Sequence, residues 1–286
     1  MKRCLVINNP KAGRKKAVKI KKHITDFLLS KNIKFKSICI DEAHKINYSD
    51  FDIIIIIGGD GTINRIIPYV LNSDKVIGLI PCGTANLLAA KLGITTNIKQ
   101  AISIIERKNI TRIDTLKIGT SYSVLRTGLG YDSDIICKTP QSLKNKFGYF
   151  AYFLTGILFA FRLKQKNYII YYDNKKLSVV ATCIIIANAG NMFRNWISVS
   201  KNCKLDDNKM DVFILKVKNP ILFFIEFLQI IFNKKTSTTK AMYFQTTSIV
   251  IKNDLTTGHI DGEKHKFRDN ITINIVPKSV KIFSNC

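Results

Sequence analysis

The sequence contains no Cys-x-x-Cys pair, and its seven cysteines are odd in number. This excludes the ligand spacing of a structural zinc site and provides no evident disulfide framework, so we expect reduced, mostly buried thiols. A transmembrane segment is not evident either, because the apolar run at residues 147–161 is fifteen residues long, short of the ~20 that a spanning helix needs. The apolar stretch after the basic start is too short for a signal peptide. We therefore expect a cytoplasmic protein.

Acidic residues are scarce, since 20 Asp and Glu stand against 45 Lys and Arg, which gives a formal net charge of +25. Such an excess suits nucleic acid, an anionic membrane surface or a polyphosphate, although the abundance of Lys, Ile and Asn is also typical of an AT-rich coding bias. The sequence has no arginine-rich tail, no Cys/His finger pattern and no basic block interleaved with aromatic residues. A specific nucleic-acid partner is therefore not expected.

The length of 286 residues exceeds the usual size of one hydrophobic core, so we expect two domains. Strands alternate with helices in residues 1–118, which predicts a parallel-sheet α/β domain, to which a strand near residues 280–286 is expected to return. Residues 119–279 have shorter strands joined by polar turns, which predicts a mostly antiparallel, β-rich domain. Its expected strands include residues 121–127, 168–172, 177–187 and 210–217, with a hairpin turn at residues 173–176.

Residues 58–62 read Gly-Gly-Asp-Gly-Thr and follow five consecutive isoleucines, which predict a strand buried on both faces. The glycines let the backbone turn sharply and bring its N–H groups against a phosphate chain. A carboxylate such as Asp60 beside phosphates makes electrostatic sense with a divalent cation between them. Thr62 is expected to cap a helix that begins near Asn64. A tight turn without a ligand is the alternative, but this motif is more specific than a lone GxGxxG.

A second loop of the same kind lies at residues 81–89, which read Pro-Cys-Gly-Thr-Ala-Asn-Leu-Leu-Ala. Gly83 and Thr84 follow an expected strand at residues 75–80 and open a helix. Two phosphate-binding helix starts are thus predicted at the carboxyl edge of one sheet, where ligands of open α/β sheets bind. Neither loop contains the Gly-Lys-Ser/Thr of a Walker A motif.

The first of these motifs resembles the nucleotide-binding signature of the diacylglycerol kinase catalytic domain, shared by bacterial lipid kinases and sphingosine kinases. NAD kinases and phosphofructokinases are more distantly similar. The resemblance extends over nearly the whole chain and implies a nucleotide-binding domain like that of NAD kinase and phosphofructokinase, followed by a lipid-substrate domain. An Asn-Pro-x-x-Gly loop near the N-terminus also matches the family. The nucleotide-binding residues implied are Asn8, Asn9, Gly13, Gly58, Gly59, Asp60, Gly61, Thr62, Gly83 and Thr84.

Three acidic motifs of the second half extend the resemblance. Residues 128–132 match Gly-x-Gly-Phe/Tyr-Asp, residues 261–263 match Asp-Gly-Glu, and residues 205–211 resemble a Leu-Asp-Asp-Gly-x-x-Asp loop with Asn208 in place of glycine. Clustered Asp side chains and turn carbonyls suit a hard cation. An ordinary hairpin turn is the alternative for residues 261–263. The resemblance assigns Asp60, Asp132 and Glu263 to a catalytic magnesium network, Asp206 and Asp207 to a structural magnesium, and Asp261 to taking the proton from the acceptor hydroxyl.

These motifs predict a bacterial-type lipid kinase that transfers the γ-phosphoryl group of ATP to a lipid hydroxyl, such as that of diacylglycerol, with Mg²⁺. The apolar residues 147–161 and 221–232 are flanked by Lys and Arg. They suit buried helices, and also a peripheral surface for acyl chains and anionic headgroups at the inner face of the membrane. NAD kinase is the alternative enzyme, and a basic module that binds membranes or nucleic acid is the non-enzymatic alternative. A homodimer is expected only because relatives are often dimers.

Overall fold

The computed structural model describes residues 3–285 except for nine internal gaps. These gaps are residues 141–142, 144–154, 157–162, 189–190, 194–196, 199–204, 232–239, 253–255 and 268–269. The predicted apolar stretch at residues 147–161 therefore lies outside the described residues, except for Thr155 and Gly156.

The chain forms two compact units. Unit 1 contains residues 1–113 and 278–286, and unit 2 contains residues 114–277, whereas the sequence analysis set the boundary near residue 118. The chain passes from one unit to the other along two long strands, β5 (Ile110–Ile118) and β18 (Asn270–Phe283). Each unit is described separately below.

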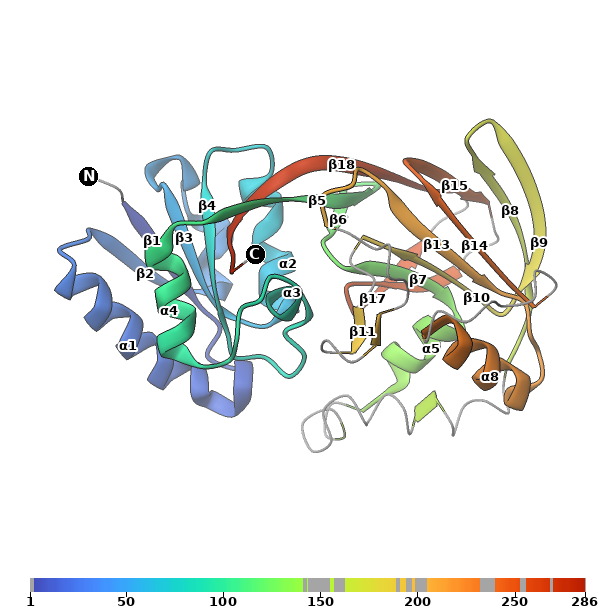
Figure 1. The fold of residues 1–286 in the computed structure, drawn as a ribbon, viewed down its shortest axis with the longest axis horizontal. Coiled ribbons are helices and arrows are strands. Elements are labelled where there is room, and N and C mark those ends of the chain that lie inside the picture. The colour runs from blue at the N-terminus through green and yellow to red at the C-terminus, as the bar shows by residue number, and fades with distance from the viewer. Residues whose placement is uncertain are drawn as a thin grey trace. The chain divides into compact units, whose positions relative to one another are not determined.

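Unit 1 is built on a parallel sheet in the order β2, β1, β3, β4, and the end of β18 pairs in parallel with β4 (Figure 1). The strands are β1 (Cys4–Asn8), β2 (Phe35–Cys39), β3 (Ile53–Gly58) and β4 (Val76–Pro81). Its helices are α1 (Lys16–Ser30), α2 (Asp60–Val70), α3 (Leu87–Lys91) and α4 (Ile98–Arg107), with 3₁₀ helices at Ala12–Lys15, Ile40–Lys45 and Tyr48–Asp50. Four of the five isoleucines of β3 are at most 1% exposed, which confirms the predicted buried strand.

Among its described residues, unit 2 contains two large antiparallel arrangements of strands and a separate antiparallel pair, β11 with β12. One large arrangement joins the first half of β18 to β15, β8 and β9, and the other has the order β14, β13, β10, β7, β16, β17. The strands are β6 (Ser121–Ser123), β7 (Arg126–Gly130), β8 (Lys166–Tyr172), β9 (Lys175–Ala181), β10 (Cys183–Ala187), β11 (Asn191–Phe193), β12 (Ile197–Ser198), β13 (Met210–Leu215), β14 (Ala241–Thr246), β15 (Ser248–Lys252), β16 (Thr256–Ile260) and β17 (Glu263–Phe267). The helices in the described part of this unit are α5 (Tyr131–Lys138) and α8 (Pro220–Ile231).

Two hydrophobic clusters cover the two faces of the larger antiparallel sheet. Ile184 and Ile186 of β10 join a core shared with strands β8, β9 and β15 of the other sheet. The alternate residues of β10, Cys183 and Ile185, pack with Tyr131 of α5 and with side chains that include Phe223 of α8. All five residues of β10 are therefore buried. The predicted combination of a parallel N-terminal sheet and an antiparallel C-terminal region is confirmed.

Two predicted strands were wrong in extent. Residues 121–127 form two short strands, β6 and β7, because the chain turns at Val124 and Leu125. Residues 177–187 also divide, at Thr182, into strands that belong to different sheets. Residues 177–187 are rich in β-branched residues, and the break in residues 121–127 falls at the apolar Val124 and Leu125, so strand propensity does not mark either break. The hairpin predicted at residues 173–176 is present, with Asp173 and Asn174 at positive φ.

Candidate active site

The two glycine loops of unit 1 lie in direct contact. Gly59 is the N-cap residue of α2 and has an extended backbone, with φ of −111°. A Cβ atom on Gly59 would lie 2.9 Å from the Cα of Gly83, and a Cβ atom on Gly83 would lie 2.6 Å from the Cα of Gly59. Both positions thus require glycine because two backbones meet there. The loop after β3 and the loop after β4 form one continuous, side-chain-poor surface.

Asp60 connects these two loops. It is the first residue of α2, and its buried carboxylate accepts hydrogen bonds from the backbone N–H groups of Leu87, at 3.0 Å, and Leu88, at 3.1 Å. The carboxylate therefore caps α3, the short helix of the second loop. A carboxylate oxygen can accept more than one contact, so these two hydrogen bonds do not exclude a metal ion. A metal role for Asp60 stays a prediction.

The predicted role of Thr62 as the helix cap was wrong. Because Gly59 provides the extended cap and α2 already begins at Asp60, Thr62 lies inside the first turn. Its hydroxyl accepts a hydrogen bond from the side-chain amide of Asn9, at 2.9 Å. The predicted phosphate-binding residue Thr62 therefore ties the loop after β1 to the loop after β3.

The loop after β1 also approaches the second glycine loop. Gly13 has φ of +58°, and a Cβ atom on it would lie 2.1 Å from the carbonyl oxygen of Cys82. At the end of β1, the side-chain oxygen of Asn8 is buried and has no hydrogen-bond partner among the residues that the structure describes. A buried polar atom without a partner is unusual and indicates a missing ligand or water. The ends of three neighbouring strands therefore meet at one edge of the sheet.

The remaining predicted nucleotide residues lie in the same loops. Gly58 ends β3, where a Cβ atom would lie 2.5 Å from the side chain of Thr62, and Gly61 lies in α2. Thr84 is exposed. Asn86 was missed: its side chain accepts a hydrogen bond from the N–H of Gly83, at 2.8 Å, and donates one to the carbonyl of Gly83, at 2.9 Å. The sequence offered only the residue type as a signal, because Asn tolerates the left-handed region that Asn86 adopts, with φ of +53°.

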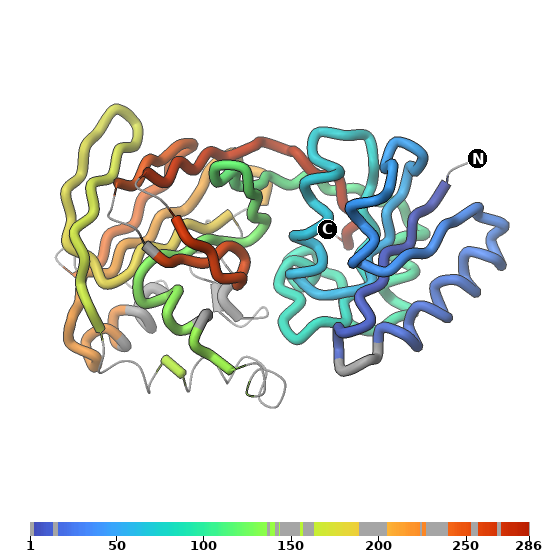
Figure 2. Tube along the Cα trace, turned by 180° about the vertical axis from the view of Figure 1, so that it is seen from behind, coloured from blue at the N-terminus to red at the C-terminus, as the bar shows by residue number. Residues whose placement is uncertain are grey.

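In unit 2 the Asp-Gly-Glu motif forms the hairpin between β16 and β17. Asp261 and Gly262 both have positive φ, and Ile260 pairs with Glu263 across the two-residue loop. Figure 2 shows this hairpin beside the segment that contains β6 and β7. Glu263 is exposed. The Asp-Gly-Glu motif is therefore itself part of a hairpin turn.

The carboxylate of Asp261 is anchored to the turn between β6 and β7. Its Oδ1 accepts hydrogen bonds from the Ser123 hydroxyl, at 2.5 Å, and from the N–H groups of Leu125, at 3.0 Å, and Arg126, at 2.9 Å. Its Oδ2 accepts from the N–H of Val124, at 2.8 Å. Burial raises the pKa of the Asp261 carboxyl, while these hydrogen bonds favour its charged form. The backbone amides exposed by the strand break are thus bound by this aspartate.

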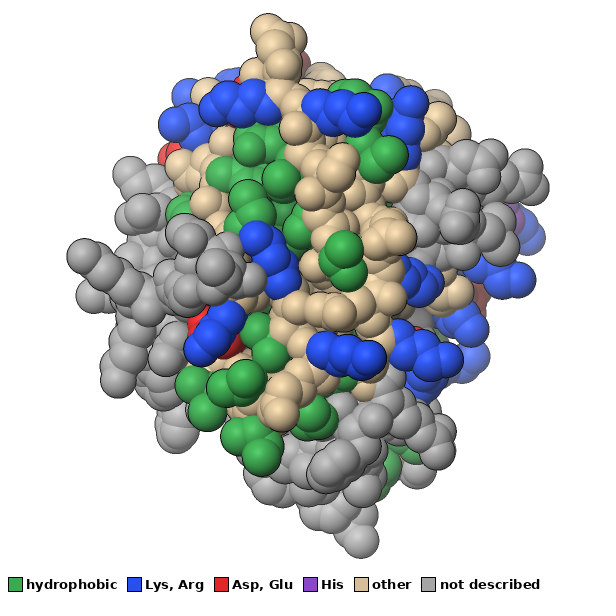
Figure 3. Space-filling view, turned by 90° about the vertical axis from the view of Figure 1, so that its right-hand side faces the viewer, with side chains coloured by type: hydrophobic (Ala, Val, Ile, Leu, Met, Phe, Trp, Pro, Cys, Tyr) green, Lys and Arg blue, Asp and Glu red, His purple; other side chains and the backbone are tan. Residues whose placement is uncertain are grey.

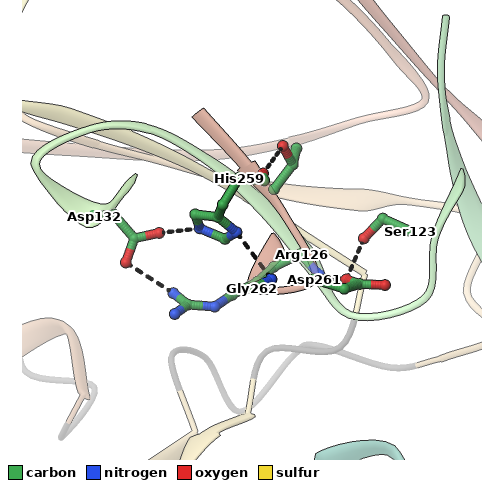
Figure 4. Close-up of polar contacts among 7 residues, drawn as sticks. Ser123, Arg126, Asp132, His259, Asp261 and Gly262 are labelled. Carbon is green, nitrogen blue, oxygen red and sulfur yellow. Dashed lines mark hydrogen bonds and ion pairs between the residues drawn. The ribbon is translucent and has the colours of Figure 1, made fainter. Parts of the chain in front are cut away.

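Asp132 lies at the start of α5 and is 6% exposed. Its Oδ1 lies 3.2 Å from Nη1 of Arg126, and its Oδ2 lies 2.7 Å from Nε2 of His259, as Figure 4 shows. Burial alone would raise the pKa of Asp132, but Arg126 and His259 together lower it to about 2. The carboxylate is therefore ionised at neutral pH. Arg126 and His259 are site residues that the sequence analysis missed.

The predicted structural magnesium residues differ in their surroundings. Asp206 is exposed. Burial raises the pKa of Asp207, and the neighbouring carboxylates of Asp211 and Asp114 add to the shift. One buried oxygen of Asp211 has no hydrogen-bond partner within the described part of the chain. Asn208 has φ of +59°, so it adopts the backbone expected of the glycine it replaces.

These oxygen ligands suit a hard cation chemically. Nevertheless, the described residues contain no group of three or more His, Cys, Asp or Glu side chains arranged to hold a metal ion. The structural magnesium site assigned to Asp206 and Asp207 stays a prediction.

Several known proteins are similar to this chain. A Staphylococcus saprophyticus protein named diacylglycerol kinase is 28% identical over 180 residues, which cover 62% of this chain and 59% of that protein. A Staphylococcus haemolyticus protein of the same name is 28% identical over 180 residues, which cover 62% of this chain and 54% of that protein. The similarity therefore spans less than two thirds of either relative.

Crystal structures of similar fold come from Bacillus anthracis. One, described as a diacylglycerol kinase, has a TM-score of 0.75 at 20% identity and covers 99% of this chain and 97% of its own. A second has a TM-score of 0.81 at 20% identity with the same coverage. At this identity the likeness establishes the fold.

The model of the diacylglycerol kinase catalytic domain matches residues 3–118, a segment that contains all three loops described above. Residues 3–118 of this chain are therefore similar to the catalytic domain of diacylglycerol kinases.

Proposed function

We propose that the protein is a lipid kinase that transfers the γ-phosphoryl group of ATP to a lipid hydroxyl, such as that of diacylglycerol. The main observation behind this proposal is that the loops after β1, β3 and β4 of unit 1 contact one another. Gly59, Gly83 and Gly13 bring three backbone segments into contact at the carboxyl edge of a parallel sheet. This edge is where open α/β sheets bind phosphate-containing ligands, and it lies within the segment that matches the kinase family.

Phosphoryl transfer requires mainly that the protein position the reactants and stabilise charge. In the proposed mechanism the glycine loops and the N-terminus of α2 bind the phosphate chain. Mg²⁺, when bound, would neutralise phosphate oxygens, and we propose Asp60, Asp132 and Glu263 for its network. The buried, ionised Asp132 and the exposed carboxylate of Glu263 are oxygen donors of the kind that Mg²⁺ prefers.

Asp261 remains our proposal for the residue that takes the proton from the lipid hydroxyl. Burial raises the pKa of its carboxyl, which makes it a stronger base than an ordinary aspartate. The hydrogen bonds from residues 123–126 hold the carboxylate in one orientation. A general base must be held in this way to remain within reach of the proton that it accepts.

We further propose that the protein acts from the cytoplasm on the inner face of the membrane, and α8 supports this. Among the described residues no helix is long and apolar enough to cross a membrane. Along α8, however, Ile221, Leu222 and Ile225 are 71%, 38% and 44% exposed, whereas Phe223 and Glu226 are 5% and 2% exposed. The helix therefore turns its acidic residue inward, where Lys240 pairs with it at 3.3 Å, and turns three apolar side chains outward.

An ordinary surface helix turns its apolar side chains toward the core and its charged side chains toward solvent, and these residues of α8 do the reverse. This arrangement suits a helix that lies on a lipid surface, where apolar side chains leave water and basic residues meet anionic headgroups. Figure 3 shows one face of the molecule on which exposed hydrophobic side chains lie among lysine and arginine side chains. The net charge of +25 favours the same partner.

The membrane proposal is tested by sedimentation with phosphatidylglycerol-containing vesicles. Ile221→Asp should weaken binding severalfold, and rising salt should weaken the wild type, because each basic residue near an anionic surface contributes about 1 kcal/mol that salt screens. Leu29→Asp is the matched control, because Leu29 is 66% exposed on α1, in unit 1. Equal binding by all three proteins at every salt concentration would contradict the proposal.

The enzymatic proposal is tested by incubating the protein with labelled ATP, Mg²⁺ and a panel of lipids that includes diacylglycerol, phosphatidylglycerol and a sphingoid base. We expect label in at least one lipid. Label in NAD but in no lipid would identify an NAD kinase. The absence of nucleotide turnover with every acceptor would favour a basic binding module.

A further inference from the structure

His259 of β16 is completely buried, and no motif of the sequence analysis includes it. Its ring lies between two segments that the proposed function uses, Asp132 on α5 and the Asp261–Gly262 turn (Figure 4). A buried histidine is often only a satisfied core residue, so its contacts decide whether it does more.

The two ring nitrogens have different partners. Nδ1 of His259 accepts a hydrogen bond from the backbone N–H of Gly262, at 3.3 Å. A nitrogen that accepts carries no proton, so the proton lies on Nε2, which donates to Oδ2 of Asp132 at 2.7 Å. In this arrangement Nδ1 is the acceptor from Gly262 and Nε2 is the donor to Asp132. The ring connects the backbone of the turn to the carboxylate of Asp132.

The surrounding structure leaves this pair little room to move. Gly128 on β7 faces His259 in the sheet. A Cβ atom on Gly128 would lie 2.2 Å from Oδ2 of Asp132 and 2.6 Å from Nε2 of His259. The backbone carbonyl of His259 also accepts a hydrogen bond from the Thr127 hydroxyl, at 2.6 Å. Gly128 is thus required because the imidazole and the carboxylate occupy the space above it.

We propose that His259 is a positioning residue: it orients the carboxylate of Asp132 for the magnesium network and couples that orientation to the Asp261–Gly262 turn. This inference rests on the proposed function. Arg126 fixes the other oxygen of Asp132, at 3.2 Å, so the carboxylate is held from two sides. Partners that orient a metal-binding carboxylate typically affect metal affinity or activity 10–100-fold when they are removed.

A pair of variants that differ by one methylene group tests the coupling. In His259→Gln the side-chain amide nitrogen reaches the position of Nε2 and can donate to Asp132, whereas in His259→Asn the amide ends near Nδ1 and leaves Asp132 without this donor. We expect His259→Asn to lower kcat about 10–100-fold and to raise the Mg²⁺ concentration for half-maximal activity. His259→Gln should stay within about fivefold of the wild type on both measures, which is the rescue that a merely structural role does not predict.

Two measurements keep the outcomes separate. His265→Gln on β17 is the control, because His265 contacts Phe267 and lies outside this network, and it should leave kcat and the Mg²⁺ response unchanged. Circular dichroism establishes that each variant is folded. If Gln and Asn lower activity equally, or if neither does, the positioning role is overturned. If the Asn variant does not fold, a folded Gln variant with a large loss of activity also overturns it.

Imidazole ¹⁵N NMR of the wild type separates this inference from the proposed function. We expect the Nε2–H tautomer, with a shift of the Nε2 resonance in Asp132→Asn. That result would support the coupling even if no lipid were phosphorylated, in which case only the kinase proposal fails. A proton on Nδ1, or an Nε2 resonance insensitive to Asp132→Asn, would overturn the coupling whatever the activity.

Discussion

Replacement of Asp261 by asparagine separates an anchoring role from a catalytic one. The aspartate accepts hydrogen bonds at Oδ1 from Ser123, Leu125 and Arg126, and at Oδ2 from Val124. Asparagine can keep its oxygen toward the first three donors. Its NH₂ group must then face the N–H of Val124, where two donors meet and neither is satisfied.

The expected loss of stability in Asp261→Asn follows from these hydrogen bonds. A hydrogen bond to a charged group contributes about 1.5–3 kcal/mol, and a buried donor left without a partner costs about 1–3 kcal/mol. Asp261→Asn should therefore destabilise unit 2 by roughly 2–4 kcal/mol, which lowers a melting temperature by about 2–4 °C per kcal/mol for a domain of this size. Ser123→Ala removes a single donor and should cost about 1 kcal/mol.

Calorimetry measures the loss of stability, and hydrogen exchange locates it. The amide of Val124 should exchange faster in Asp261→Asn than in the wild type, because its acceptor has become a donor. If Asp261 is also the base, kcat should fall by about 10²–10⁴ in the folded variant. An unchanged melting temperature with unchanged exchange at residues 123–126 would refute the anchoring role, and near-normal kcat would refute the catalytic one.

Two further predictions concern the loops and the Asp132 network. Gly83→Ala should lower ATP affinity about tenfold or more while the protein stays folded, because the new Cβ would force the loop away from Gly59. Isothermal titration calorimetry measures the ATP affinity, with Gly119→Asn as the control, because no atom lies within 4 Å of the Cβ position of Gly119. Equal affinities of the two variants would contradict the prediction. Because the folded pKa of Asp132 is lowered from 3.8 to about 2, its ionisation contributes about 2 kcal/mol that is present above pH ~4 and lost as the pH falls toward ~2. Denaturant unfolding of Arg126→Met should show most of its destabilisation at pH 7 and less at pH 3, and the same destabilisation at both values would count against the ion pair.

The sequence alone was sufficient for the elements whose signals are local. The isoleucine run predicted the buried strand β3, and glycine-rich motifs at two strand ends predicted two loops at one sheet edge. The closeness of these loops was not visible in the sequence, because it depends on how β3 and β4 pair: a Cβ atom added to Gly83 would lie only 2.6 Å from the Cα of Gly59. Glycine at both positions was the signal, but its cause is contact between backbones.

Long-range partners account for most of what the sequence did not reveal. Asp261 and the backbone amides that it binds are separated by 135–137 positions along the chain. His259 lies 127 positions from Asp132, and no periodicity or motif connects the two. The strand break at Val124 and Leu125 has the same origin: the residues are apolar and would suit a strand, but their N–H groups bind the Asp261 carboxylate instead of a neighbouring strand.

The Asp-Gly-Glu motif shows why a turn and a site need not be alternatives. A two-residue hairpin loop of this kind requires positive φ at both positions, and Asp261 and Gly262 have φ of +47° and +88°. In this conformation the Asp261 side chain reaches back to the β6–β7 turn, while the N–H of Gly262 is free to meet Nδ1 of His259. A glycine-free turn with ordinary φ would place neither group there. The turn geometry is therefore the physical cause of the contacts that hold Asp261 and, through His259, Asp132.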